Sequence, residues 1–271
     1  MTGLVDMPWW GYVLYTLIAT HLTIIGVTLY LHRSICHRAL EMHPLVTHVL
    51  RLWLWLSTGM DTRQWVAIHR KHHAKVETAE DPHSPMVYGI NKVLFEGVEL
   101  YRAAGKDQSI VEKYGHGCPE DWLELKLYRG HSDKGYYVMM AINLLLFGPI
   151  GLTIWAVQMA WIPLFAAGGI NGVGHYWGYR KFETADTSTN IVPWGTIIGG
   201  EELHNNHHAF ASSAKFSVQW YEFDIGWMYI CCMRALGLAK VKKLPPRMVE
   251  IPGKGMPDAD TLRAVLSNRF Q

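Results

Sequence analysis

Histidines with the spacing of metal ligands are the most informative feature of this sequence. The chain has 271 residues and 15 histidines, and eight of the histidines lie in three short clusters. Imidazole nitrogens bind zinc, copper, iron and nickel. Residues three and four positions apart share one face of a helix, so an H-x-x-H-H cluster can direct several imidazoles to one point. The three clusters are His32 and His37; His69, His72 and His73; and His204, His207 and His208.

A ninth histidine and the spacing of the first cluster bear on the number of metals. His175 lies one helical turn after Asn171. Nine imidazoles are too many for one ion, so we expect two metal ions with four or five ligands each. The five-residue gap between His32 and His37 is a rotation of about 140° on an ideal helix of about 3.6 residues per turn. We therefore expect these two histidines to serve different metals or to lie on both sides of a helix end.

Two other kinds of metal site fit the sequence less well. The His-Glu-x-x-His signature of zinc hydrolases is absent. Soluble di-iron bundles use carboxylates and two Glu-x-x-His motifs. The pairs Glu80/His83 and Glu201/His204 have this spacing, but Pro82 would interrupt the first helix and the second pair overlaps an H-x-x-H-H cluster. A carboxylate-bridged bundle is therefore the weaker interpretation.

Two long apolar stretches must position these histidines. Residues 9–31 are apolar apart from one histidine and a few threonines and glycines, and residues 136–174 contain no Lys, Arg, Asp, Glu or His. At ~1.5 Å per residue the second stretch is ~58 Å long, about twice the ~30 Å hydrocarbon core of a bilayer. We therefore expect a helical hairpin with crossings at about residues 136–153 and 155–174, turning near residues 148–151 or slightly later.

A shorter segment, residues 44–60, is expected to lie in the membrane interface. It is short for a span and contains Arg51, and a crossing here would put the first and second histidine clusters on opposite sides of the membrane. Lys and Arg are absent before the first crossing and frequent near these clusters, so the histidine side is the cytoplasm. Residues 61–135 and 176–271 then form a cytoplasmic cap, whose tail beyond Pro245 is expected to be loosely held.

These elements predict an all-α integral membrane protein with three crossings, an interfacial helix and a helical cap that holds a di-metal site. One domain covers residues 1–271. The formal net charge of +2 gives no sign of a nucleic-acid partner. The four cysteines form no Cys-x-x-Cys pair, so neither an iron–sulfur centre nor a zinc site of that kind is expected.

The order and spacing H-x4-H, H-x2-HH, H-x2-HH resembles the membrane fatty acyl desaturase family, in its acyl-CoA and bacterial delta-9 acyl-lipid branch. The stretch from His69 to His83, the Asn171-Gly-Val-Gly-His175 element and the Gly237–Lys243 segment are also similar to that family. The resemblance covers about residues 12 to 243. It implies that nine histidines bind two irons and that the asparagine reaches one iron through water. The implied ligands are His32, His37, His69, His72, His73, His175, His204, His207 and His208, with Asn171 as the indirect contact.

The resemblance also implies an activity. Such an enzyme uses O2 to introduce a cis double bond, here at the delta-9 position, into an acyl chain carried by CoA, a lipid or a carrier protein. Catalysis then rests on the metal centre alone, and electrons come from an external ferredoxin, rubredoxin or cytochrome b5-like donor with its reductase. Trp65 matches an aromatic residue that lies beside the acyl chain. The implied location is the bacterial inner membrane, with the active site on the cytoplasmic side.

Two alternatives stay open. A hydroxylase or acetylenase can use the same iron centre, because the three reactions share the first hydrogen abstraction. A non-catalytic membrane protein that binds or transports metal predicts polar residues within the crossings. The hairpin has few of them: Asn143, Thr153, Gln158 and Asn171.

Further residues are assigned supporting roles. Ligating histidines need hydrogen-bond partners that orient their rings, although a carboxylate can equally be an ordinary solvated charge. His21 lies eleven residues before His32, on the same helix face as Thr28. It either bonds to a neighbouring helix or, together with Thr28 and Trp65, borders the acyl channel. The orienting candidates are Glu77, Asp81, His83, Glu201 and Asp224.

Overall fold

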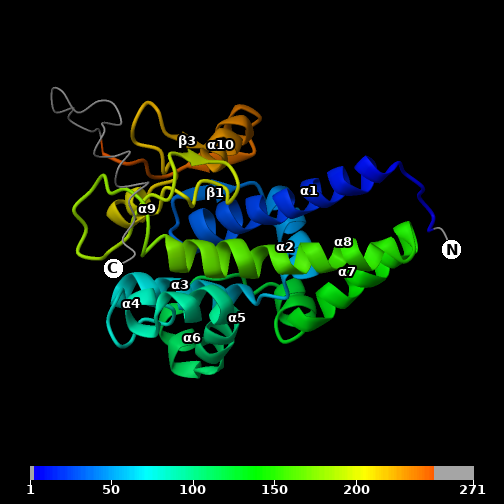
Figure 1. Cartoon of the computed structure of the whole chain (residues 1–271), viewed down its shortest axis with the longest axis horizontal. Helices are drawn as coiled ribbons and strands as arrows, with labels where there is room; N and C mark the ends of the chain where they lie inside the picture. Colours follow the sequence, from blue (N-terminus) through cyan, green and yellow to red (C-terminus); the bar gives the residue numbers. More distant parts are fainter. Residues whose placement is uncertain (1–2, 247–271) are drawn as a thin grey trace.

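The computed structural model describes residues 3–246 and is dominated by helices that run along its longest axis (Figure 1). Two of these helices change from α-helical to wider π-helical winding before they reach the histidines. In the first, α1 passes directly into η1, and in the second, α8 passes into η3. Their bounds are α1 (Trp9–Ile25), η1 (Gly26–Cys36), α7 (Ser132–Phe147), α8 (Ile150–Trp161) and η3 (Ile162–Val173).

Shorter helices surround the histidine end of these long helices. The all-α expectation holds apart from two small strand pairs, β1 with β4 (antiparallel) and β2 with β3 (parallel). The remaining helices are α2 (Pro44–Thr58), α3 (Thr62–Lys75), α4 (Pro85–Tyr88), α5 (Ile90–Lys106), α6 (Gln108–Tyr114), η2 (Glu124–Tyr128), α9 (His204–Ala209) and α10 (Ile225–Ala235). The strands are β1 (Leu40–Met42), β2 (Trp194–Gly195), β3 (Phe223–Asp224) and β4 (Ala239–Val241).

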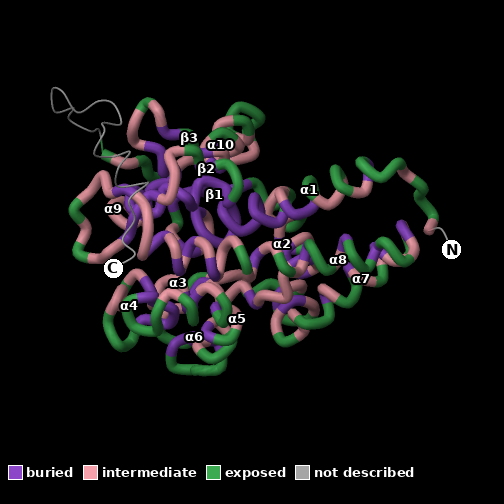
Figure 2. Tube along the Cα trace, viewed as in Figure 1, coloured by how far each residue is buried: buried purple, intermediate pink, exposed green. Residues whose placement is uncertain are grey.

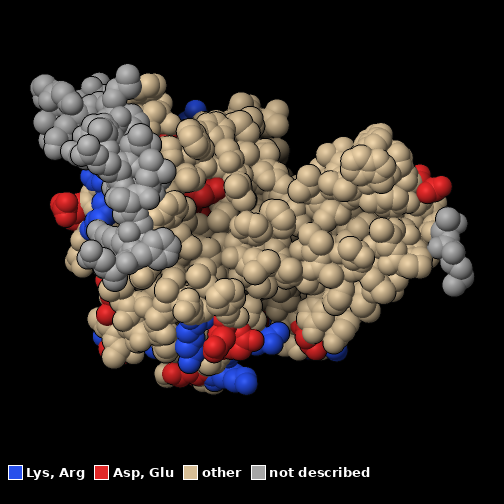
Figure 3. All heavy atoms as spheres, in the orientation of Figure 1, with Lys and Arg blue, Asp and Glu red and all other residues tan. Residues whose placement is uncertain are grey.

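Two continuous helices, Trp9–Cys36 and Ile150–Val173, are long and apolar enough to cross a membrane. α7 runs antiparallel to α8 and completes the hairpin, with 16 residues. Many residues at the end of the molecule near the N-terminus are exposed (Figure 2). This end carries almost no charged side chain on the face shown in Figure 3. Burial concentrates instead around η1, where Tyr30 is fully buried. The number of crossings stays a prediction.

The hairpin differs from its predicted bounds. Its turn lies at Gly148 and Pro149, within the predicted residues 148–151, but its first arm spans Ser132–Phe147 and so begins and ends earlier than the predicted residues 136–153. Gly148 has a left-handed φ of 67°, which a glycine adopts without steric cost, and Pro149 cannot continue the hydrogen-bond ladder of α7. The part of the predicted cap beyond residue 246, including most of the predicted loose tail, lies outside the described residues.

α2 occupies the segment predicted to lie in the interface, and a buried arginine fixes it to the cap. The Arg51 guanidinium donates to Asp121 at 3.0 Å and to Glu124 at 2.9 Å. Glu124 and Arg51 are both buried, so this pair ties α2 to η2. The Trp55 indole donates to the backbone carbonyl of His131 at 3.0 Å, which links the same helix to the start of α7.

Glycines bring α5 and η3 close together beside the site. A Cβ atom at Gly168 would lie 2.8 Å from the backbone oxygen of Leu94, and one at Gly97 would lie 3.2 Å from that of Ala167. A Cβ atom at Gly168 would force the two backbones to shift, and one at Gly97 would make a tight contact. These glycines therefore set the spacing of α5 and η3, which form two walls of the cavity described below.

Candidate metal centre and the cavity beside it

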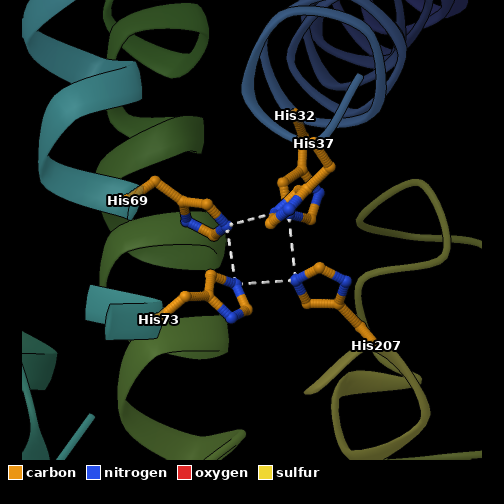
Figure 4. Close-up of side chains that lie close together, drawn as sticks. All are labelled: His32, His37, His69, His73 and His207. Carbon is orange, nitrogen blue, oxygen red and sulfur yellow. Dashed lines mark hydrogen bonds between the residues drawn. The ribbon is translucent and has the colours of Figure 1, made fainter. Parts of the chain in front are cut away.

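Five histidines from three helical segments point at a common centre (Figure 4). His32 and His37 come from the end of η1, His69 and His73 from α3, and His207 from α9. Their Nε2 atoms are 3.1 Å apart for His37 and His69, 3.0 Å for His69 and His73, 2.9 Å for His73 and His207, and 3.1 Å for His207 and His32. Two nitrogens bound at ~2.1 Å and at right angles to one ion are about 3.0 Å apart. The spacing is therefore that of a metal-ligand set.

The other four histidines form a second group next to the first. His72, His175, His204 and His208 place one nitrogen each within 4.8 Å of one another. The Nε2 atoms of His204 and His175 are 3.0 Å apart. Among the described residues, Nε2 of His72 and Nε2 of His208 are buried and have no hydrogen-bond partner. Buried polar atoms are normally paired, so these two nitrogens fit a metal ion as their missing partner.

Carboxylates orient four of the nine rings through the nitrogen that faces away from the centre. Such bonds fix the tautomer and the ring direction of a ligating histidine. One of these bonds belongs to the five-histidine group and three belong to the four-histidine group. The Nδ1–carboxylate distances are 2.7 Å for His32 and Glu201, 3.0 Å for His72 and Asp81, 3.3 Å for His175 and Glu77, and 2.9 Å for His208 and Asp186.

The loop after α3 is folded around two of these carboxylates. Glu77 takes a left-handed φ of 59°, which is uncommon for a residue with a side chain. Its carboxylate also accepts a hydrogen bond from the backbone N–H of Thr187 at 2.7 Å. Asp81 accepts from the backbone N–H groups of Glu77 at 2.7 Å and of His83 at 3.1 Å. The helix α3, which carries the second histidine cluster, and the loop that follows it are therefore one structural unit.

The π-helical winding of η1 explains why His32 and His37 share a group. The backbone N–H of His37 donates to the carbonyl of His32 at 3.0 Å, a bond between residues five apart. This bond brings both residues to one side, and their ring centroids are 4.8 Å apart. His37 is also the first residue beyond the helix. The prediction that they serve different metals is therefore not supported, whereas the alternative at the helix end matches the structure.

Burial keeps these imidazoles in the form that binds metal. Burial, and then the neighbouring His175, hold the pKa of His204 well below its usual range. Burial and His204 do the same to the pKa of His208. A neutral imidazole has a free lone pair, so the rings need not lose a proton before a metal binds.

A cavity of about 820 Å³ adjoins both histidine groups. His32, His69 and His204 form part of its wall. The Trp65 ring stacks on His69 with centroids 5.0 Å apart and an angle of 9° between the rings, and it also lines the cavity. The size is within the range of roughly 300–1,000 Å³ for ligand sites in proteins. Thr28, His83, Asn171 and Glu201 are among the other lining residues.

Two assignments from the sequence need correction. His21 is absent from the cavity wall, and its Nε2 lies 2.9 Å from the Tyr229 hydroxyl on α10. Of the two roles predicted for His21, the structure therefore supports the bond to a neighbouring helix and not the channel position. Asp224 contacts no ligand histidine but pairs with the buried Arg33, with Nη2 and Oδ1 2.9 Å apart. The Phe216 ring contacts both Arg33, whose guanidinium lies 3.8 Å from the ring centroid, and His207, with ring centroids 4.8 Å apart.

His83 and Asn171 take positions that differ from those of the ligands. The His83 ring stacks on His72 with centroids 4.4 Å apart, and its Nδ1 is buried without a partner among the described residues. Burial and the neighbouring His72 lower the pKa of His83 to about 3, so this ring is also neutral. Asn171 lies on the cavity wall.

Comparison with known proteins agrees with this geometry. The family model for fatty acid desaturases matches residues 7–228. The chain belongs to the fatty acid desaturase family. It is 31% identical to an icosanoyl-CoA 5-desaturase of Limnanthes douglasii over 82% of its own length and 62% of that relative. It is 31% identical to an sn-1 stearoyl-lipid 9-desaturase of Synechocystis sp. (82% and 68%) and 30% identical to delta-9 acyl-lipid desaturase 2 of Arabidopsis thaliana (82% and 71%). The chain thus spans less than two thirds of the Limnanthes relative.

Within this desaturase fold, the sequence left two supporting residues unassigned. Asp186 holds His208, but it lies in an irregular loop where no spacing distinguishes it. Arg70 stands inside the second cluster and was counted only as a positive charge. Its guanidinium donates to four backbone carbonyls, at 2.7 to 3.0 Å, and so joins α3 to the end of η1 and to the loop after α6. These carbonyls belong to Ile35, Cys36, Tyr114 and His116.

Proposed function

We propose that this protein is an O2-dependent fatty acyl desaturase that introduces a cis double bond into an acyl chain. The observation that carries the proposal is that two histidine groups, of five and four residues, adjoin one cavity whose wall also includes many apolar side chains. Two irons held by these groups would supply the oxidant, formed with O2, that removes hydrogen from an unactivated methylene. Asn171 is proposed to reach one of the irons through water.

The chain's own residues would bind the acyl group and keep water away. Ile24, Val27, Ile162 and Ile170 line the cavity with branched apolar side chains. Burying an alkyl chain against such side chains is favourable at roughly 25 cal/mol per Å². Trp65 is proposed to lie along the chain beside His69. The wall thereby fixes which methylene lies nearest the irons.

The other part of the same wall is polar and suits a carrier head group. Arg102, Lys106 and Gln108 line the cavity at the end of α5 and the start of α6. Two cations favour an anionic head group, such as the phosphates of CoA or of a phospholipid. The names of the relatives include both a CoA-linked and a lipid-linked substrate, and both the 5- and the 9-position. We propose delta-9 chemistry on an acyl chain carried by CoA or a lipid, with a carrier protein as a third possibility.

The membrane placement follows from the apolar helices. We propose three crossings, α1, α7 and α8, with the histidine groups on the cytoplasmic side of a bacterial inner membrane. Reaction with O2 consumes electrons, and we propose that an external ferredoxin, rubredoxin or cytochrome b5-like protein delivers them from a reductase.

A metal-transport function is less well supported. A transport path needs polar groups along the crossings, yet Asn143 on α7 and Gln158 on α8 bond to each other at 3.0 Å. Both side chains are buried. Hydroxylation or triple-bond formation would use the same metal centre. These reactions are distinguished from desaturation only by their products.

The product decides between these reactions. The reduced, iron-loaded protein would be incubated with O2 and deuterium-labelled stearoyl-CoA or stearoyl-phospholipid, and the acyl chains would be analysed by mass spectrometry. The proposal predicts loss of two hydrogens at positions 9 and 10. Gain of one oxygen would identify a hydroxylase, loss of four hydrogens an acetylenase, and an unchanged chain with bound metal a non-catalytic protein.

A further inference from the structure

The side of the cap formed by β2, β3 and α10 exposes large apolar side chains. Trp194 is 63% exposed, Ile197 57%, Phe223 40% and Met228 39%. β2 and β3 pair in parallel with Trp194 opposite Phe223, which places these two side chains side by side. Apolar side chains gathered in this way on a surface mark a site of interaction.

The two chain segments that build this surface expose no charged side chain. Residues 191–200 and 216–233 contain only two acids, Glu222 and Asp224, and both are buried. Glu222 accepts from the Tyr179 hydroxyl at 3.0 Å, and Asp224 pairs with Arg33. These segments therefore turn their acids inward and their aromatic side chains outward, the reverse of a water-facing surface.

α10 has the pattern of a helix that lies flat on an apolar phase. Met228, Cys232 and Leu236 project from one face, four residues apart, and all three are exposed. Gly226 and Ile230, on the opposite face, are buried. Basic residues follow only at and beyond the end of α10, where Arg234 and Lys240 are exposed.

This surface adjoins the apolar stretch of α1. The bond between Tyr229 and His21 attaches α10 to α1. On α1, the residues around His21 that face outward are also apolar: Ile18 is 52% exposed and Leu22 43%. The outer surface of α1 thus passes into that of α10 at the level where the helices enter the cap.

We propose that α10, with Trp194, Ile197 and Phe223, is seated in the cytoplasmic interface of the lipid bilayer. Aromatic side chains and amphipathic helices are stabilised at the depth of the head groups, and the cations at the end of α10 favour phosphate groups there. This inference rests on the membrane placement proposed above. Its partner is a lipid surface and not a second protein.

Contacts of one carboxylate connect α10 to the helix that carries His32. Asp224, the last residue of β3, accepts from the backbone N–H of Trp227 at 2.9 Å and so caps α10. The same carboxylate holds Arg33, which is the neighbour of His32 in η1. A fixed depth of α10 would therefore fix the depth of the histidine groups, and with it the length of chain between the lipid surface and the irons.

Spin labels can measure this depth in the intact protein. A background with Cys118→Ser, Cys231→Ser and Cys232→Ser, which keeps the buried Cys36, would receive Phe223→Cys or Met228→Cys. The labelled protein would be reconstituted in nanodiscs of phosphatidylcholine and phosphatidylglycerol, and power saturation would compare accessibility to O2 and to nickel-EDDA. Leu14→Cys on the exposed face of α1 is the lipid control, and Glu112→Cys on α6 is the water control.

The proposal predicts that labels at positions 223 and 228 prefer O2, as at position 14, whereas position 112 prefers the nickel complex. It is overturned if both labels behave like position 112 while position 14 prefers O2. If position 14 also prefers the nickel complex, the membrane placement itself is wrong and this inference with it. Positions 223 and 228 lie on different elements, so the loss of one variant to misfolding leaves the other to decide.

Discussion

The Asp81 carboxylate lies 3.0 Å from Nδ1 of His72, and both side chains are buried. Burial opposes the charge of Asp81, but the bond to His72 outweighs it and lowers the pKa of this carboxyl to about 2. The charged carboxylate therefore holds the His72 ring with Nε2 directed at the other members of the four-histidine group. Partners of this kind are worth roughly 10- to 100-fold in metal affinity.

Replacing Asp81 should weaken one metal site selectively. In Asp81→Ala the His72 ring loses its orienting acceptor, so we expect metal retention to fall by about 10- to 100-fold in the four-histidine group. Iron per chain would be measured after dialysis against a chelator. Glu80→Gln is the matched control, because Glu80 is exposed and contacts only Lys75 among ionic partners in the described part of the chain. Equal iron retention in Asp81→Ala and Glu80→Gln would contradict the assigned role.

Replacing Arg70 should loosen the junction between α3 and η1. Arg70→Met removes donors from four backbone carbonyls, and hydrogen bonds from charged groups contribute about 1.5–3 kcal/mol. At roughly 2–4 °C per kcal/mol for a chain of this size, the thermal midpoint in detergent should fall by at least about 3 °C. The control is Lys71→Met, at the next position. A midpoint for Arg70→Met equal to that of the control would show that these bonds contribute nothing.

The approach of α5 to η3 should tolerate a methyl group at one glycine and not at its neighbour. Gly168→Ala would place Cβ 2.8 Å from the Leu94 carbonyl, whereas Gly169→Ala would meet no atom of another segment closer than 3.9 Å. Overpacking of this kind costs typically about 1–3 kcal/mol. We expect a lower thermal midpoint and a lower rate for Gly168→Ala only. Identical behaviour of the two variants would mean that the two helices can separate freely.

His21 should matter for stability and not for chain length. His21→Phe and Tyr229→Phe each remove one side of a 2.9 Å bond, and a double-mutant cycle should give a coupling of about 0.5–1.5 kcal/mol. The lengths of the acyl products should stay unchanged, because His21 is not part of the cavity wall. A shift in product length without loss of stability would restore the channel role predicted from the sequence.

The histidine pattern predicted the histidines that the structure gathers into two groups, because short helical spacings are local. The arrangement of the first cluster was harder to predict, because an ideal α-helix separates His32 from His37 and the π-helical winding of η1 brings them together. Partners that come from distant loops could not be read from spacing. Asp186 reaches His208 through the irregular loop between His175 and α9. Asp224 was a candidate partner for the histidines, but the structure pairs it with Arg33.

The helices were predictable in kind and less so in extent. Hydropathy identified α1, α2 and the hairpin, and Gly148 and Pro149 marked its turn, but the first arm was predicted several residues too late. The two short strand pairs have no hydrophobic alternation of their own, since each contains two or three residues per strand. They form because the elements on both sides bring them together.

The number of irons per chain tests the central claim most directly. Protein purified with iron would be analysed by plasma mass spectrometry as the wild type, as His37→Ala from the five-histidine group, as His204→Ala from the four-histidine group, and as the control His43→Ala. Two irons are expected in the wild type and in His43→Ala, with clear loss in each ligand variant. A single iron per chain in the wild type, or two irons retained in His204→Ala, would contradict the account.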